Sequence, residues 1–169
     1  NDATLSPMEV WKIENPLEWL VCSFSGGGTM RPAAWLVHSE LINTAGLWNE
    51  KLSLHDDGEY FTRVLLQSDK QIFVKGARAY YRIVPNSLSR QRSREAAESG
   101  YLSCQLRDKQ LLAYRTDSHA LAAIATLYGR YAYMFAAHAP DLAYAAVARI
   151  EELKEKPYNN IGSSIFRIL

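Results

Sequence analysis

The acidic stretch from His55 to Val64 holds the side chains best suited to chemistry. Asp56 and Asp57 are adjacent carboxylates at the point where a polar loop gives way to an amphipathic helix. A helix N-terminus is the positive end of a dipole and exposes free backbone N–H groups, so a carboxylate there is stabilised in its ionised form. An ionised carboxylate that faces a cleft can take a proton from a hydroxyl group. The pair is therefore a candidate general base.

A structural interpretation of the same stretch stays open at this stage. Asp56 and Glu59 have the spacing of a capping box, in which each side chain bonds a backbone N–H of the first helical turn. Glu59 and Arg63 are four residues apart in the favourable order and can pair on the helix surface. On this interpretation the carboxylates only begin a helix.

A second polar cluster follows the acidic stretch. Arginines and serines crowd into one short segment that contains Arg82, Ser87, Ser89, Arg90, Arg92, Ser93 and Arg94. Guanidinium groups and hydroxyls suit phosphate oxygens, although a solvated basic loop would have the same composition. The whole chain carries a net charge of only +1, so no overall field favours nucleic acid or an anionic membrane.

The remaining composition is that of a soluble globular protein. Of the 169 residues 48% are hydrophobic and 22% are charged, which is ordinary for such proteins. Cys22 and Cys104 are too few and too far apart for a disulfide framework, so reduced thiols are expected. We expect a cytoplasmic location, with a peripheral position at a membrane left open. Because the chain begins at Asn1 in mid-pattern, we also expect it to be a piece of a longer protein.

The elements that must position these side chains can be inferred from hydrophobic spacing and from cap residues. Short strands are expected at 33–37, 71–74 and 77–83, and helices at 7–14, 40–45 and 58–68. From about residue 95 onward the apolar spacing is helical throughout. The pattern predicts a mixed α and β part over residues 1–92 and a helical extension over residues 93–169.

Three segments in a fixed order carry a resemblance to a known family. They run from Gly26 to Glu50, from Asp56 to Val64 and from Gly76 to Ser89. Their order resembles the C-terminal half of bacterial family 2 glycosyltransferases, which have the GT-A fold, and the match covers roughly residues 20–92. The resemblance implies an α/β fold (α+β in this piece), namely the C-terminal part of a GT-A domain followed by a small helical bundle.

The resemblance also implies roles for individual residues. Asp57, with Asp56 beside it, would be the base that deprotonates the acceptor hydroxyl. Pyrophosphate contacts would come from Arg82, Ser87, Ser89, Arg90 and Arg92, and the acceptor side would be lined by Gly27, Gly28, Thr29 and Trp48. If Leu5-Ser6-Pro7 aligns with the metal motif of the family, Asp2 is a ligand for Mg²⁺ or Mn²⁺ in the intact enzyme.

The expected function of the intact protein is therefore transfer of a sugar, with inversion, from a nucleotide-sugar donor to a glycan or lipid-linked acceptor. The chain alone is expected to be inactive, and its uncovered apolar surface is expected to favour a homo-oligomer or a domain-swapped dimer. No nucleic-acid partner and no transmembrane segment are expected. The rival is a non-catalytic helical interaction module in which the acidic motif is only a cap. A metal-dependent hydrolase is a weaker third possibility, because a second set of metal ligands is not visible.

Overall fold

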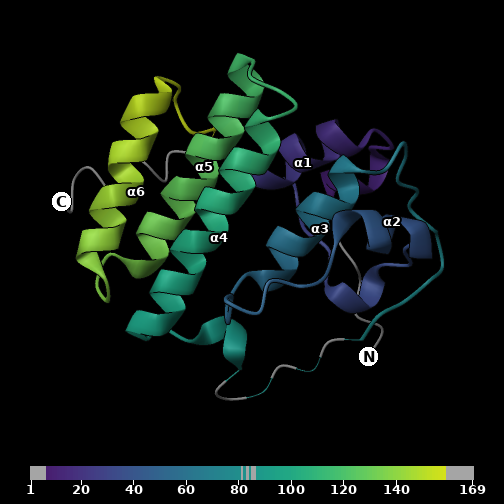
Figure 1. Cartoon of the computed structure of the whole chain (residues 1–169), viewed down its shortest axis with the longest axis horizontal. Helices are drawn as coiled ribbons and strands as arrows, with labels where there is room; N and C mark the ends of the chain where they lie inside the picture. The colour runs from purple at the N-terminus through teal and green to yellow at the C-terminus, as the bar shows by residue number, and fades with distance from the viewer. Residues whose placement is uncertain (1–6, 81, 83, 85–86, 159–169) are drawn as a thin grey trace.

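The structure is a computed structural model that describes residues 7–80, 82, 84 and 87–158, and every regular element in it is a helix (Figure 1). The α-helices are α1 (Pro16–Phe24), α2 (Ser39–Ala45), α3 (Asp56–Leu66), α4 (Arg94–Leu112), α5 (Ser118–Phe135) and α6 (Pro140–Leu153). Three short 3-10 helices are η1 (Glu9–Lys12), η2 (Pro32–Ala34) and η3 (Leu88–Arg90).

Local sequence explains where most of the helices begin. The side chains of Asn15, Ser93 and Asp117 each accept a hydrogen bond from a backbone N–H of the helix that follows, at 3.1, 3.2 and 3.0 Å. Such caps satisfy N–H groups that have no partner within the helix. Pro16 and Pro140 occupy the first turns of α1 and α6, where a missing N–H costs nothing.

Helix α5 lies at the centre of the packing. It contacts α1, α4 and α6, and Figure 1 shows α4, α5 and α6 side by side. Its buried residues are mostly small, which lets the neighbouring helices approach closely. Gly100 of α4 is one such close approach, since a Cβ there would lie 3.2 Å from the ring of Tyr131. One hydrophobic cluster includes side chains of α1, α3, α4, α5 and α6. The helices on both sides of residue 92 therefore share a core.

The expected α/β fold is wrong. No strand and no sheet occur in the described residues, so the portion of a GT-A fold implied by the resemblance is not there. Residues 33–37 begin in the 3-10 helix η2, and residues 71–74 and 77–80 have no regular structure. Residues 81 and 83 lie outside the described part. The β-branched and aromatic residues in these segments favour a strand only where a neighbouring strand pairs with it and one face is covered.

Several helical predictions are confirmed. Helices were expected at 40–45 and 58–68 and throughout the second half of the chain, and the structure has α2, α3, α4, α5 and α6 there. The helix expected at 7–14 is only the 3-10 helix η1, and α1, which follows it, was not predicted. Cys22 and Cys104 are free thiols. None of the described helices combines the length and apolar content that a membrane span requires.

Candidate functional site

The acidic motif sits at a sharply defined helix start. His55 precedes α3 with a left-handed backbone, at φ 59°, and Asp56 is the first helical residue. Helix α4 holds this turn in place, because Ser103 Oγ donates a hydrogen bond to the His55 carbonyl at 2.9 Å. Ser99 Oγ, one turn earlier in α4, accepts from the backbone N–H of Leu54 at 2.9 Å. The turn before the acidic pair is thus fixed by α4.

The capping box expected at Asp56 and Glu59 does not form. The cap position is His55, and no side chain caps the helix there. Glu59 is only 3% exposed and accepts hydrogen bonds from Arg63 at 2.8 Å and from Gln110 of α4 at 2.7 Å. The predicted Glu59–Arg63 pair is confirmed, but it is buried at the α3–α4 contact and not on the surface. Glu59 is therefore structural, which leaves Asp56 and Asp57 as the acidic groups free for chemistry.

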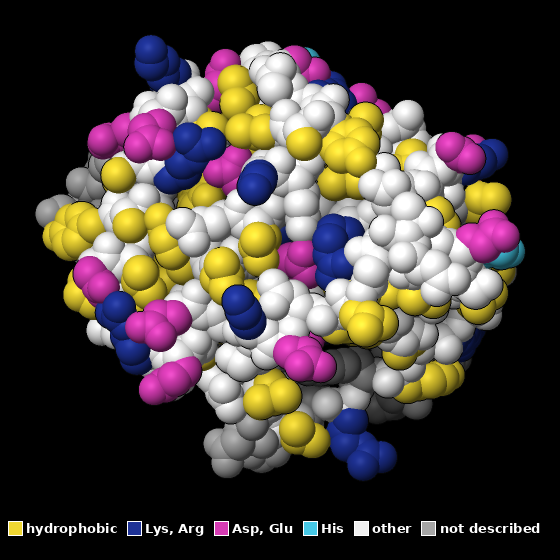
Figure 2. Space-filling view, in the orientation of Figure 1, with side chains coloured by type: hydrophobic (Ala, Val, Ile, Leu, Met, Phe, Trp, Pro, Cys, Tyr) yellow, Lys and Arg dark blue, Asp and Glu magenta, His cyan; other side chains and the backbone are white. Residues whose placement is uncertain are grey.

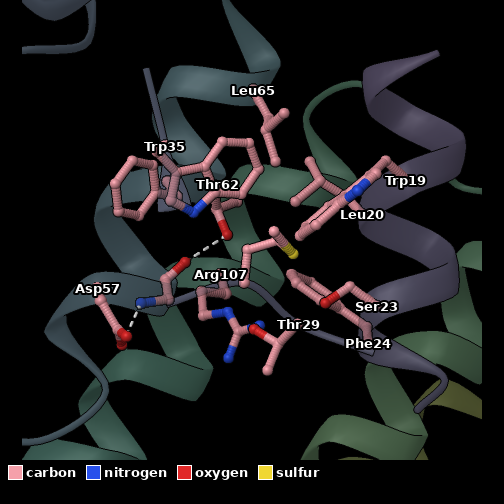
Figure 3. A pocket seen from close by; sticks show the side chains of 13 residues that line it. Trp19, Leu20, Ser23, Phe24, Thr29, Trp35, Asp57, Thr62, Leu65 and Arg107 are labelled. Atoms are coloured by element: carbon pink, nitrogen blue, oxygen red, sulfur yellow. Dashed lines mark hydrogen bonds between the residues drawn. The ribbon is translucent and has the colours of Figure 1, made fainter. Parts of the chain in front are cut away.

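Asp57 lines a small pocket with aromatic walls (Figure 3). Its Oδ1 accepts a hydrogen bond from the Gly58 N–H at 2.7 Å, which fixes the carboxylate at the mouth of the first turn. Trp35 stacks on Phe61, with ring centroids 4.9 Å apart, and meets Trp19 edge to face at 5.3 Å. The volume of the pocket is about 30 Å³, room for one functional group of a ligand, since a water needs roughly 10–15 Å³ on this scale.

Arg107 of α4 brings a positive charge to the same pocket. Its guanidinium stacks over the Phe24 ring at 4.3 Å and lies against Gly58 in the first turn of α3. Burial lowers the pKa of Arg107, and the Asp57 carboxylate acts in the opposite direction. In Figure 3, Asp57, Arg107 and Thr29 lie along one side of the view, opposite Trp35 and Leu65. The pocket thus places a carboxylate and a guanidinium around one small space.

The pKa of His55 is shifted by the charged groups around the acidic motif. Burial lowers its pKa, and the positive charges of Arg107, Arg130 and Arg92 lower it further, while Asp57 raises it. This end of α3 is therefore surrounded by arginines contributed by α4, α5 and the segment before α4.

Of the residues predicted to bind pyrophosphate, only Arg92 is placed near the acidic end of α3. Arg92 lies over the Phe135 ring at 5.6 Å and is close enough to affect the pKa of His55. Ser87 and Ser89 bond to each other through their hydroxyls at 3.0 Å. Arg82, Ser89 and Arg90 are exposed, and none of the five predicted residues lines the pocket.

The predicted acceptor-side residues also divide into two groups. Thr29 lines the pocket beside Asp57. Local packing explains the glycines at positions 27 and 28. The Gly27 N–H donates a hydrogen bond to the Cys22 carbonyl at 2.9 Å. Gly28 has φ 123°, and a Cβ there would collide with Met8. Trp48 stacks on Tyr60 at 4.4 Å, outside the residues that line the pocket.

The predicted metal site has no counterpart in the described residues. Asp2 lies outside the part of the chain that the structure describes. Within that part, no group of three or more His, Cys, Asp or Glu side chains is placed to hold an ion. Asp56 and Asp57 alone are too few oxygen ligands for Mg²⁺ or Mn²⁺, which take about six. Participation of a metal in the intact protein stays a prediction that depends on Asp2.

Sequence reasoning missed two residues of the pocket. Trp35 packs against the core and also lines the pocket. Nothing in the sequence indicated that Arg107 would line the pocket, because it stands in a helix whose place against α3 depends on tertiary packing. Comparisons with protein-family models, with curated proteins and with solved structures find no match to this chain.

Proposed function

We propose that the intact protein transfers a sugar from a nucleotide-sugar donor to a hydroxyl of an acceptor, with Asp57 as the general base. The observation that carries the proposal is the position of Asp57, an acidic residue in the first turn of α3 that faces a pocket walled by Trp19, Trp35 and Phe61. A carboxylate is a suitable partner for a sugar hydroxyl, and the space beside Asp57 has room for one such group.

The geometry supports a specific division of labour within Asp57. Oδ1 accepts from the Gly58 N–H, so Oδ2 is left to accept a proton from the acceptor hydroxyl. As that proton moves to Oδ2, the hydroxyl oxygen forms a bond to the anomeric carbon of the donor. The bond from that carbon to the nucleotide phosphate breaks on the opposite side, which inverts the configuration. The nucleoside diphosphate leaves with the bonding electrons.

The departing diphosphate needs positive charge, and Arg92 is the best-placed member of the basic segment. It lies near His55 and thus near the acidic end of α3, and guanidinium groups bind phosphate oxygens through paired N–H donors. We assign Arg92 this role ahead of Arg82 and Arg90, which are exposed.

The test is the Asp57→Asn variant of the intact protein, with Asp56→Asn as the matched control. Both variants would be incubated with uridine, guanosine and thymidine diphosphate sugars and Mn²⁺, and release of the nucleoside diphosphate would be measured. Loss of the base is expected to lower kcat by about 10²–10⁴-fold in Asp57→Asn, and Asp56→Asn is expected to retain most of the activity. Activity of Asp57→Asn close to that of the wild type would remove Asp57 as the base.

A second function, that of a non-catalytic interaction module, is favoured by a different observation. An open groove of about 610 Å³ is lined by residues of α4, α5 and α6, among them Tyr101, Leu112 and Ala145. Figure 2 shows hydrophobic side chains exposed among mixed charges over this face. On this alternative the pocket at Asp57 binds no substrate, and neither the wild type nor any variant transfers sugar. A substitution that fills the groove, such as Ala145→Arg, would then abolish binding of the partner.

A further inference from the structure

Two hydrogen-bond donors that line the pocket lie buried without an acceptor among the described residues. They are Nε1 of Trp35 and Nε of Arg107. Buried donors are rarely left without an acceptor in folded proteins. Both residues line the same small space as Asp57, so a ligand in that space would be the source of an acceptor that the described residues do not supply.

Arg107 also lacks a counterion among the described residues. No ion pair to Arg107 is found in the described part, although the Asp57 carboxylate acts to raise its pKa against the effect of burial. In contrast, carboxylates pair directly with Arg63, Arg94, Arg115 and Arg149. Arg92 and Arg130 add further positive charge near the same helix end. An anionic group would therefore be stabilised here.

Size and charge together select the kind of anion. About 30 Å³ admits one planar group of three heavy atoms and not a whole sugar ring. A guanidinium edge offers two parallel N–H donors that match the two oxygens of a carboxylate. A phosphate is bulkier and carries up to two charges, so the neighbouring Asp57 would repel it more strongly than a carboxylate with its single charge.

We propose that the acceptor is an acidic sugar, a uronic acid unit whose carboxylate binds Arg107 and the Trp35 indole while a neighbouring hydroxyl meets Asp57. The inference rests on the proposed function, because it takes Asp57 as the group that binds the hydroxyl. Arg107 is then a specificity-determining residue. It selects an acceptor with a carboxylate over the neutral sugar that has a hydroxymethyl group in the same place.

The direct test measures binding of methyl β-D-glucuronide and methyl β-D-glucoside, which differ only at this group, to the 169-residue chain by calorimetry. The glucuronide is expected to bind about tenfold more tightly or better, the range of one charge-assisted hydrogen-bond pair. Arg107→Gln is expected to abolish this preference, while Arg78→Gln, an exposed arginine outside the pocket, retains it. Equal affinities for the two glycosides, or an unchanged preference in Arg107→Gln, would overturn the proposal.

A second measurement needs no variant and so does not depend on the folding of Arg107→Gln. The chain has four tryptophans, and the indole N–H resonances of Trp35 and Trp11 make a matched pair. Both indole nitrogens are buried without an acceptor, but Trp11 does not line the pocket. The glucuronide is expected to shift the Trp35 resonance downfield and leave Trp11 in place. A shift in both, or in neither, contradicts the proposal.

The outcomes separate this inference from the proposed function. Tighter binding of inorganic phosphate than of the glucuronide would overturn the choice of a carboxylate. If the glucuronide binds through Arg107 but Asp57→Asn of the intact protein stays active, the carboxylate site stands and the proposed base falls. If Asp57→Asn is inactive but the two glycosides bind equally, the proposed function stands and the acidic acceptor falls.

Discussion

At the scale of single residues, His55 determines how the acidic pair is presented. Its left-handed backbone ends the preceding loop, and its carbonyl is held by Ser103, so Asp56 and Asp57 begin α3 at a fixed point. Its imidazole is enclosed among arginines, which together with burial lowers its pKa. The residue that fixes the start of α3 thus also carries an imidazole whose pKa differs from its ordinary value.

The lowered pKa of His55 predicts a pH dependence of stability. The unfolded chain takes up the proton first, at about pH 6.5, so stability is lost as the pH falls below that value, until the folded protein also protonates. Asn tolerates a left-handed backbone, so His55→Asn keeps the turn and removes this contribution. Between pH 7.5 and 5.5 the wild type is therefore expected to lose more of its free energy of unfolding than His55→Asn does.

Urea unfolding at the two pH values measures this difference, and carboxylates titrate alike in both proteins, so their contribution cancels. His119→Asn, which replaces an exposed histidine of α5, is the control and is expected to follow the wild type. If the free energy of unfolding changes equally with pH in the wild type and in His55→Asn, the prediction is wrong, because folding then leaves the pKa of His55 unchanged.

At the scale of elements, a buried polar contact fixes α4 against α5 and α6. Asp108 of α4 is 5% exposed and accepts hydrogen bonds from Arg149 Nε at 2.8 Å and from the Tyr128 hydroxyl at 3.1 Å. Burial and the Asp108 carboxylate raise the pKa of Tyr128. Because α4 also carries Arg107, this contact helps to set where the guanidinium meets the pocket.

Removing one partner of this contact is expected to cost more than removing the charge from both. Arg149→Met leaves the Asp108 carboxylate buried and unpaired, which is expected to lower the free energy of unfolding by about 2–3 kcal/mol, below the value for fully enclosed pairs because Arg149 is 32% exposed. Asp108→Asn combined with Arg149→Met keeps an acceptor for Tyr128 and is expected to recover at least half of the loss. Urea unfolding gives both values, and equal losses in the single and double variants would contradict this account.

The elements also show how far sequence could predict this molecule. Apolar spacing from about residue 95 onward was enough to predict helices there, and their starts at Ser93, Asp117 and Pro140 each depend on a cap or a proline within one turn. Arg107 could not be predicted to line the pocket with Asp57, because its place against Gly58 requires α4 to pack on α3. The strands expected at 71–74 and 77–83 failed for a related reason, since a strand depends on a partner strand that the described residues do not supply.

At the scale of the whole molecule, the shared core holds the chain together as one unit, whereas the exposed segment after α3 offers a surface for association with a second copy. The core joins helices from both parts of the chain, so the pocket depends on α1, α3 and α4 packing as one unit. Residues 71–74 lie outside that core. There Ile72 and Val74 are 65% and 64% exposed, whereas Phe73 between them stacks on Trp11 at 4.6 Å. This alternation is that of a strand with one face uncovered.

We therefore expect the chain to self-associate through this segment, since exposed apolar residues with strand propensity pair readily with a second copy. Lysines at both exposed positions, in Ile72→Lys/Val74→Lys, would place like charges opposite each other in any such pairing and are expected to yield a monomer. The matched control is Leu36→Lys/Leu47→Lys, which adds the same charge at apolar residues that are 102% and 86% exposed elsewhere. Sedimentation velocity over a range of concentrations measures the outcome. A wild-type chain that stays monomeric throughout, or two double variants that dissociate equally, would assign the exposed residues of this segment no role in assembly.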